Sequence, residues 1–302
     1  MRCLPTLTAL LLACCSLVPL PAAAKGPATQ IAYVHGHELI GVTPDGSHRW
    51  VIGRVPRGVV DLAASADGRL FALLANRPVR VGERGSDRSL YLLRPGRGLR
   101  LLDSWHDLGP RSVALSQSGD ELAFVRGGEI WSRRVGSGRA VRVTSAPGSA
   151  AAPAFFADGE ELVFERTGMG QPGLYRAPLR GGRPEAQLVA GDFSEPAVSA
   201  KGSVAFRAED RSTDEVHLGL IRAGGVRPRF IGRSEDPFQD GGPSFSPSSS
   251  HLAFFSQREG PRRLRYSLET VNLDGSNRRA IIGDIGAGSI GPVWTAMPRA
   301  RG

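Results

Sequence analysis

Residues 59–72 read VVDLAASADGRLFA, and this stretch decides the fold. Two short runs of apolar residues flank the segment Ser-Ala-Asp-Gly. Ser, Asp and Gly favour tight turns, and apolar runs of strand length on both sides of such a turn are typical of paired strands. The stretch therefore predicts a β-hairpin.

The same pattern returns at four further places, residues 113–124, 153–164, 196–206 and 243–254. A second hairpin follows each copy, with turns at residues 95–98, 136–138, 180–182, 223–225 and 274–276. Two hairpins in each repeat make a four-stranded unit, and radial repetition of such units is a β-propeller. No long stretch has apolar residues at helical spacing, which argues against an α/β fold.

The two ends of the chain supply a sixth unit. Residues 30–52 contain only three predicted strands, and residues 291–296 carry the strand pattern that is missing there. We therefore predict an all-β fold: a six-bladed β-propeller of four-stranded antiparallel blades, closed by the C-terminal strand joining the N-terminal blade. The blades are expected at about residues 30–53 plus 291–296, 59–102, 111–144, 151–189, 195–231 and 242–282.

The N-terminus has the pattern of a signal peptide, predicted over residues 1–24. Arg2 precedes an uncharged apolar run over residues 4–20, and three alanines at 22–24 offer a cleavage site. Residues 25–302 then form a single propeller domain, periplasmic or secreted. The alternative is a lipoprotein, because Leu-Leu-Ala before Cys14 resembles a lipidation signal that would anchor the chain to a membrane.

Composition narrows the chemistry. All three cysteines, Cys3, Cys14 and Cys15, lie in the predicted signal peptide, so residues 25–302 contain no disulfide and no cysteine nucleophile. The formal net charge is +9, carried mainly by scattered arginines, and such a surface attracts anionic partners. We expect no nucleic-acid partner, because an exported protein rarely meets nucleic acid.

The repeats resemble those of the TolB family of β-propellers. The matching pieces pair residues 122–124 with 130–131, residues 162–164 with 174–175, and residues 245–247 with 252–254. The resemblance covers about residues 30–296 and implies a propeller of the cell envelope. TolB itself carries a preceding α/β domain, which we do not expect here because few residues separate Lys25 from the first strand.

Motifs for catalysis are missing from the sequence. No Gly-x-Ser-x-Gly nucleophile elbow occurs, and the six histidines are spread over different repeats. We therefore predict no catalytic residues, no cofactor and no metal ligands, and expect that the protein is not an enzyme.

Candidate binding residues come from topology. In a propeller, the loops that lead from the outer strand of one blade to the inner strand of the next gather at one mouth of the central channel. Aromatic and arginine side chains within a polar rim are typical of binding surfaces. The predicted partner-binding residues are Arg57, Trp105, His106, Asp107, Arg111, Asp192, Glu195, Asp236 and Asp240.

The sequence thus favours a monomeric protein- or peptide-binding scaffold of the cell envelope. Two alternatives stay open. One is a propeller enzyme, either a metal-dependent lyase or a hydrolase, with site residues from several blades. The other is a carbohydrate-binding surface module that uses Trp105 and the carboxylates of the loops.

Overall fold

The structure is a computed structural model that describes residues 28–76, 87–105, 111–168, 170–181, 183–210, 215–231, 239–260 and 263–298. These residues form 24 β-strands and no helix. Within the same ranges, no helix is found with the length and apolar character needed to cross a bilayer. The all-β prediction is therefore confirmed.

Four sheets have four antiparallel strands each. The first contains β24 (Ile290–Ala296), β1 (Thr29–His35), β2 (Glu38–Val42) and β3 (Arg49–Arg54), in that order. The second contains β4 (Val59–Ala64), β5 (Phe71–Asn76), β6 (Arg88–Arg94) and β7 (Gly98–Trp105). The third contains β8 (Val113–Leu115), β9 (Glu121–Arg126), β10 (Glu129–Arg134) and β11 (Val141–Arg142). The fourth contains β12 (Ser149–Phe155), β13 (Glu161–Thr167), β14 (Gly173–Pro178) and β15 (Ala186–Ala190).

A fifth sheet has eight strands, in two sets of four. One set is β16 (Phe193–Val198), β17 (Val204–Asp210), β18 (Glu215–Ile221) and β19 (Arg229–Ile231). The other is β20 (Gln239–Phe245), β21 (His251–Glu259), β22 (Leu264–Asn272) and β23 (Arg279–Ile282). A single parallel residue pair, Val216 with Gln239, links the two sets.

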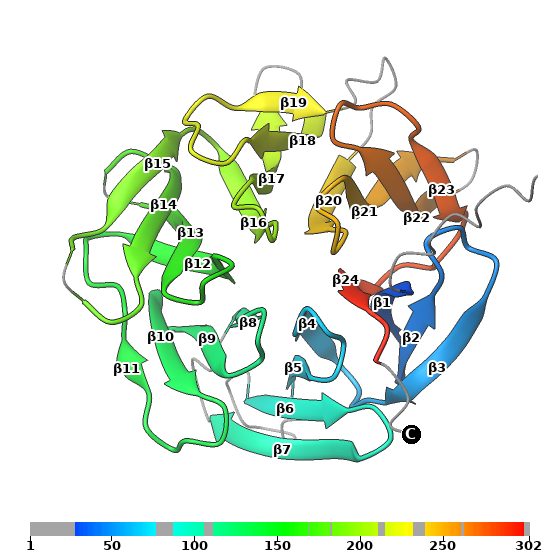
Figure 1. The fold of residues 1–302 in the computed structure, drawn as a ribbon, viewed down its shortest axis with the longest axis horizontal. Coiled ribbons are helices and arrows are strands. Elements are labelled where there is room, and N and C mark those ends of the chain that lie inside the picture. The colour runs from blue at the N-terminus through cyan, green and yellow to red at the C-terminus, as the bar shows by residue number, and fades with distance from the viewer. Residues whose placement is uncertain are drawn as a thin grey trace, which may run out of the picture.

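We call each set of four strands a four-strand unit. Figure 1 shows the units arranged around a common centre, with β24, β4, β8, β12, β16 and β20 innermost. We call these the inner strands. The C-terminal strand β24 pairs antiparallel with β1, and Thr29 lies opposite Ala296. The two ends of the described chain therefore share one sheet.

The Ser-x-Asp-Gly motif forms the turn that follows an inner strand. The Ser65 hydroxyl donates to Asp67 at 2.6 Å and accepts from the Leu70 N–H at 3.1 Å. Ser116 accepts in the same way from the Glu121 N–H at 3.0 Å. These side chains satisfy backbone groups that the tight turn leaves without strand partners. Buried serines at this place therefore shape the hairpins that the sequence pattern predicted.

The inner strands begin earlier than the pattern indicated. β12, β16 and β20 start at Ser149, Phe193 and Gln239, before the predicted blade starts at 151, 195 and 242. Each contains a bulge at the residue before a proline, where the register of pairing shifts. Proline has no N–H to donate, and a bulge accommodates it without ending the strand.

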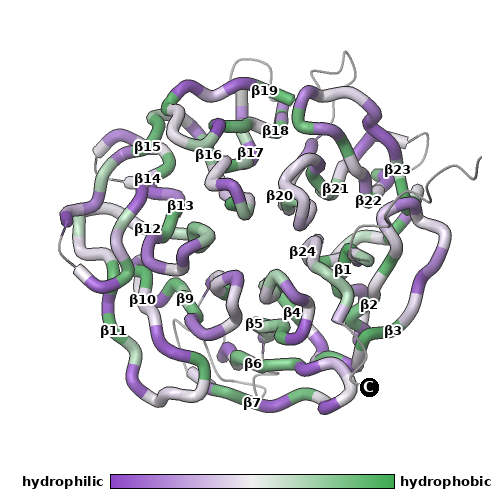
Figure 2. Tube along the Cα trace, in the orientation of Figure 1, coloured by the Kyte–Doolittle hydropathy of each residue, from purple (hydrophilic) through white to green (hydrophobic). Residues whose placement is uncertain are grey.

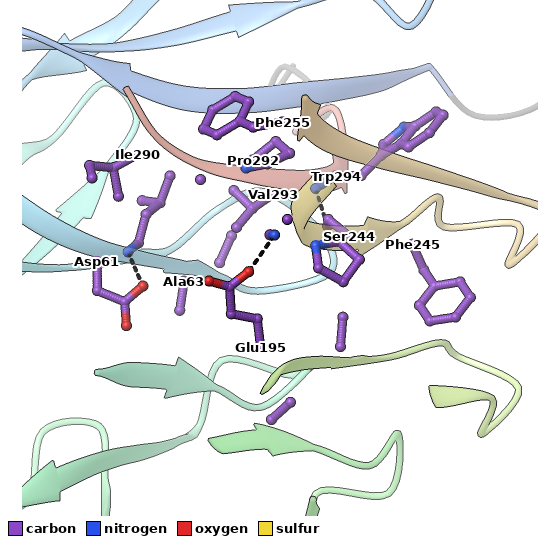
Figure 3. Close-up of a pocket in the computed structure, with 18 of the residues that line it drawn as sticks. Asp61, Ala63, Glu195, Ser244, Phe245, Phe255, Ile290, Pro292, Val293 and Trp294 are labelled. Atoms are coloured by element: carbon purple, nitrogen blue, oxygen red, sulfur yellow. Dashed lines mark hydrogen bonds between the residues drawn. The ribbon is translucent and has the colours of Figure 1, made fainter. Parts of the chain in front are cut away.

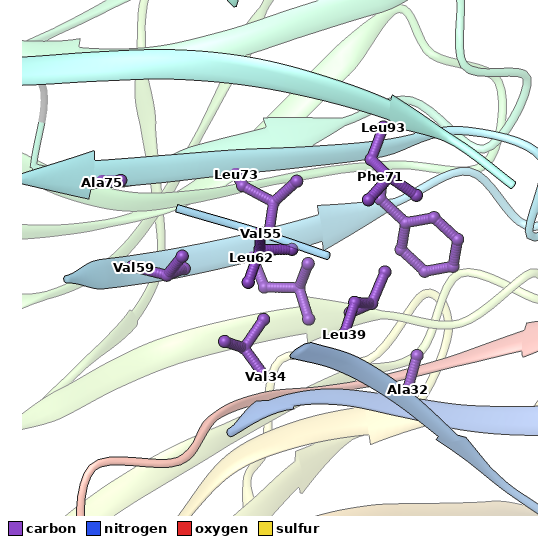
Figure 4. Packing of buried hydrophobic residues seen from close by; sticks show 10 residues of the cluster. All are labelled: Ala32, Val34, Leu39, Val55, Val59, Leu62, Phe71, Leu73, Ala75 and Leu93. Atoms are coloured by element: carbon purple, nitrogen blue, oxygen red, sulfur yellow. The ribbon is translucent and has the colours of Figure 1, made fainter. Parts of the chain in front are cut away.

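Hydrophobic side chains fill the space between neighbouring units. Figure 4 shows one cluster, in which Leu39 of the first unit packs with Leu62, Phe71 and Leu73 of the second. Five further clusters lie between other neighbouring units. Figure 2 shows hydrophobic residues recurring on middle strands such as β5, β9 and β13. Burial of each large side chain stabilises the fold by about 1.5–3 kcal/mol, so the faces between units form the core.

Candidate functional site

A cavity of about 640 Å³ lies at the centre of the units (Figure 3). Residues of all six inner strands line it. The volume is in the range of sites that hold a small ligand or a few side chains of a peptide. The cavity is therefore the first place to look for a function.

Six equivalent residues face this cavity, one from each four-strand unit. Each stands four residues before the residue that opens the turn after the inner strand. All six line the cavity, and they are Asp61, Ser112, Ala152, Glu195, Gly242 and Gly291. We call them the inner positions. Only Asp61 and Glu195 among them carry charge, so these two carboxyl groups set the electrostatics of the inner positions.

Side chains at the inner positions accept hydrogen bonds from the next unit. Asp61 Oδ2 accepts from the Val113 N–H at 2.7 Å. Ser112 Oγ accepts from the Ala152 N–H at 3.2 Å, and Glu195 Oε2 accepts from the Gly242 N–H at 2.7 Å. A polar side chain here therefore satisfies a backbone group of the neighbouring inner strand, which joins the units around the cavity.

Backbone conformation at the inner positions is unusual. Ala152 and Glu195 have φ angles of 45° and 51°, and the equivalent Gly242 has 62°. Left-handed φ angles are uncommon for residues other than glycine and cost free energy at Ala152 and Glu195. The bulge before each proline imposes this conformation and orients the Glu195 side chain into the cavity.

Aromatic side chains line one part of the cavity wall. Phe245 of β20, Phe255 of β21, Tyr266 of β22 and Trp294 of β24 all belong to the last strands of the chain. The indole Nε1 of Trp294 donates to Thr29 Oγ1 at 3.1 Å, which fixes the ring. The cavity therefore combines an aromatic wall with carboxyl groups, an arrangement suited to amphipathic ligands.

Burial raises the pKa of the Asp61 carboxyl to about 7, and the nearby Glu195 carboxylate adds to this shift. Hydrogen bonds from the N–H groups of Val113 and Leu62, and the charge of Arg88, oppose it. A carboxyl group with a pKa near 7 changes charge at neutral pH. Asp61 can therefore bind either a proton or a cation there.

A second carboxyl group lies close to Glu195. Burial raises the pKa of Glu165 on β13, the Glu195 carboxylate raises it further, and Arg207 on β17 lowers it. Arg207 itself lines the cavity and lies 3.5 Å from the Glu209 carboxylate. The cavity wall at β13, β16 and β17 is therefore a mixed cluster of two carboxylates and one guanidinium.

Of the predicted binding residues, Glu195 and Asp240 line the cavity. Asp240, however, is only 2% exposed, and its carboxylate forms a two-bond ion pair with Arg278 at 2.7 and 2.9 Å. Arg278 also contacts Glu269 at 2.7 Å. The Asp240 side chain is thus engaged inside its own sheet.

Other predicted residues lie away from the cavity lining. Arg57 is exposed between β3 and β4 and donates to His37 Nε2 at 2.9 Å. Arg111 is exposed just before β8, and Asp192 lies in the turn that precedes β16. Trp105, at the end of β7, packs on Phe124 with ring centroids 5.6 Å apart. His106, Asp107, Asp236 and Cys14 lie outside the described residues.

The sequence reasoning missed Asp61 and Arg207. Asp61 was visible as part of a repeat, but it lies within a strand and the search concentrated on loops. Alignment of the repeats on the turn serines places Asp61 beside Glu195 as an inner position. Arg207 carries no such signal, because its approach to the cavity depends on the packing of β17 behind β16.

Among the described residues, no group of three or more His, Cys, Asp or Glu side chains is placed to hold a metal ion. The carboxyl groups of the cavity are instead satisfied by backbone N–H groups and by arginine.

Repeated four-strand units around a central cavity define a β-propeller. The family model described as the TolB beta propeller domain matches residues 111–297. This match covers more than half of the chain, so the chain belongs to the TolB β-propeller domain family, and the resemblance inferred from the repeats is confirmed. No curated protein matches the sequence significantly.

Solved structures share the fold at low sequence identity. TolB from Acinetobacter baumannii matches with a TM-score of 0.68 and 18% identity, over 88% of this chain and 66% of that one. A protein assigned as TolB from Agrobacterium tumefaciens matches with a TM-score of 0.64 and 18% identity, over 85% and 91%. A chain from a nidogen–laminin complex gives 0.63 and 9% identity, over 90% and 100%. The chain thus spans just under two thirds of the first of these proteins.

Proposed function

We propose that this protein is an exported propeller that binds a protein or peptide partner of the cell envelope in its central cavity. Residues 1–24 act as the signal peptide, and residues 25–302 form the binding domain in the periplasm or outside the cell. The observation that carries the proposal is the cavity itself, with its aromatic wall and the carboxyl groups of Asp61 and Glu195.

The proposal includes six blades and a ring closed by β24. In support, β24 pairs with β1 over Thr29 to Val34, and six hydrophobic clusters each join two neighbouring units. The sixth cluster contains Ile31 and Tyr33 of β1 together with Ala253 and Leu268 of the last unit. A closed ring would hold the inner positions at fixed distances and so preorganise the cavity for its partner.

The chemistry of the cavity indicates the kind of peptide. Apolar side chains would contact Phe255, Tyr266 and Trp294, and a lysine, arginine or amino terminus would lie near Asp61 and Glu195. Charge-assisted hydrogen bonds to carboxylates are stronger than neutral ones. The fold also occurs in a protein–protein complex, because one similar structure is that of a nidogen–laminin complex.

A peptide library displayed on phage, selected on the purified protein, tests the proposal. We expect enriched peptides to carry a basic residue beside apolar ones. Their affinity should fall about tenfold or more in the double variant Asp61→Asn, Glu195→Gln, because both charges that face the cation are removed. Affinity should also be higher at pH 8 than at pH 6, because Asp61 ionises across this range.

The matched control is Asp158→Asn with Glu160→Gln, which removes two carboxylates from an exposed turn that does not line the cavity. This control should leave the affinity unchanged. Selected peptides that bind the cavity variant as tightly as the parent, or that respond equally to both variants, would exclude the cavity as the binding site.

A second candidate function, a hydrolase, is favoured by one observation. The raised pKa of Asp61, about 7, suits a general acid, and Glu195 supplies a second carboxylate in the same cavity. Paired carboxyl groups with different protonation states perform such hydrolysis. Turnover of a panel of nitrophenyl glycosides that disappears in Asp61→Asn would support this reading. Turnover that survives in the variant would reject it.

A further inference from the structure

The outer hairpins, which join the third and fourth strand of each unit, share a distinctive composition. Three of them expose a large apolar side chain next to arginines: β6–β7, β10–β11 and β18–β19. The exposed apolar residues are Leu99 (38%), Leu101 (52%), Val141 (58%), Val226 (65%) and Phe230 (40%). These five are most of the large hydrophobic residues that the described part of the chain exposes.

Arginines surround these apolar side chains. Within the described residues, six exposed arginines of the three hairpins have no carboxylate within ion-pair distance: Arg97, Arg100, Arg139, Arg142, Arg222 and Arg227. Their charges therefore face solvent without local neutralisation. The net charge of the whole chain, +9, has the same sign.

Printed contacts place the outer hairpins at the same end of the molecule. Arg229 beside β19 donates to the Leu273 carbonyl in the turn before β23, and Arg279 of β23 donates to the Pro44 carbonyl in the turn before β3 at 3.3 Å. Glu121, which follows an inner turn, accepts from Arg134 and from Arg180 of the neighbouring unit. Carboxylates at this end are thus mostly near the inner turns, and several are already paired.

From these features we propose that the protein docks on an anionic lipid surface through the tips of its β6–β7, β10–β11 and β18–β19 hairpins. Guanidinium groups bind lipid phosphates, and leucine, valine and phenylalanine enter the boundary between headgroups and acyl chains. Three tips at one end of a ring-shaped molecule contact a flat surface together, so weak contacts add up to stable binding.

A lipid surface fits these hairpins better than other occupants. A second copy of the chain would bring Arg100 and Arg142 against like charges, which net charge of +9 on each copy makes worse. An acidic polysaccharide would pair with the arginines but would leave Leu101, Val141 and Val226 without an apolar partner. Only an amphipathic anionic surface satisfies both kinds of side chain.

Co-sedimentation with vesicles tests the proposal. The probes are vesicles of phosphatidylcholine alone and vesicles with about a third phosphatidylglycerol. We expect binding to the anionic vesicles that weakens as salt rises, because the contacts are partly electrostatic. The triple variant Arg100→Gln, Arg142→Gln, Arg227→Gln should bind about a hundredfold more weakly, from the contribution expected for each basic residue at an anionic surface.

Two further variants separate the explanations. Arg54→Gln, Arg57→Gln, Arg126→Gln removes the same charge from exposed arginines outside the three hairpins and should bind within about twofold of the parent. Leu101→Ser, Val141→Ser keeps every arginine and should weaken binding about tenfold, because two apolar contacts are lost. All variants share one N-terminus, so its contribution cancels.

The proposal fails on any of three outcomes. The first is no preference for phosphatidylglycerol, and the second is an equal loss in the two arginine variants. The third is unchanged vesicle binding in Leu101→Ser, Val141→Ser, which would assign the hairpins to a soluble polyanion. Exposed side chains carry all substitutions, and thermal melting of each variant checks that the fold is kept.

Discussion

Asp61 holds its carboxyl group between two backbone N–H groups at the cavity wall, and this placement controls its titration. Both oxygens accept hydrogen bonds, from Leu62 N–H at 2.8 Å and from Val113 N–H at 2.7 Å. Burial still outweighs these bonds and raises the pKa to about 7. Because the pKa of a free aspartate is about 4, ionisation of Asp61 opposes folding.

The raised pKa of Asp61 predicts a pH-dependent stability. Below pH 4 the carboxyl is protonated in both the folded and the unfolded chain, and the penalty develops as pH rises from about 4 to about 7. Asp61→Asn removes this titration. The melting temperature of the variant, measured against the parent, should therefore improve steadily from pH 4.5 to pH 8. A difference between the two proteins that is the same at all pH values would contradict the expectation.

Arg278 satisfies two buried carboxylates, and its removal should be costly. It contacts Asp240 at 2.7 Å and Glu269 at 2.7 Å, and these carboxylates are 2% and 1% exposed. Arg278→Leu leaves both without this cation, which should destabilise the fold by about 3–5 kcal/mol in urea denaturation. The neighbouring exposed Arg279→Leu is the control and should change stability by less than about 1 kcal/mol. Equal losses in the two variants would refute the role assigned to Arg278.

Residue types at single positions were only partly readable from the sequence. Glu195 was predicted as a binding residue because it lies in a loop pattern, and the structure places it at the cavity. Trp105 fits the same pattern, yet it packs on Phe124 between two units. A sequence pattern places a residue along the strand order, but neighbours from another unit decide whether its side chain meets solvent or core.

At the scale of the strand, turn chemistry carries the prediction of the hairpins. Strand–turn–strand segments were recognised because Ser, Asp and Gly recur between apolar runs, and the serine hydroxyls do bond the turn backbone. The bulges before Pro153, Pro196 and Pro243 were missed, because the proline was taken as the start of the strand. Pairing on both sides of a bulge depends on the partner strand, which local sequence does not reveal.

Loss of one inner-turn serine should weaken its hairpin measurably. Ser116 is buried, and its hydroxyl accepts from the Glu121 N–H at 3.0 Å. Ser116→Ala leaves this N–H without its acceptor and should cost about 1–2 kcal/mol of unfolding free energy. The exposed Ser118→Ala, two residues further in the same turn, is the matched control and should cost less. If the two variants unfold at the same urea concentration, the buried hydroxyl does not have this role.

For the whole molecule, the repeat pattern anticipated the family and the β-only architecture but not the chemistry of the centre. Equivalent residues of all six inner strands meet there, and their effect depends on which of them carry charge. Asp61 and Glu195 stand in different repeats, 134 positions apart in the chain, and only the circular arrangement brings both to one cavity. A search along a single repeat therefore cannot find such a site.

The pairing of β24 with β1 predicts that a covalent link between the two chain ends should stabilise the whole molecule. Thr29 lies opposite Ala296, while the Met297 N–H bonds the Ala28 carbonyl, so Thr29 and Ala296 form a non-hydrogen-bonded pair. Side chains of such pairs are close enough for a disulfide. The double variant Thr29→Cys, Ala296→Cys should therefore oxidise readily.

The oxidised double variant should gain about 2–4 kcal/mol over its reduced form, because the link closes a very long loop in the unfolded chain. Loss of the Trp294 Nε1 bond to Thr29 Oγ1 affects both forms equally, so the reduced protein is the proper control. Guanidinium denaturation with and without reductant measures the difference. Identical midpoints would mean that the ends are apart during unfolding of the native ring, and the proposed closure by β24 would then have to be abandoned.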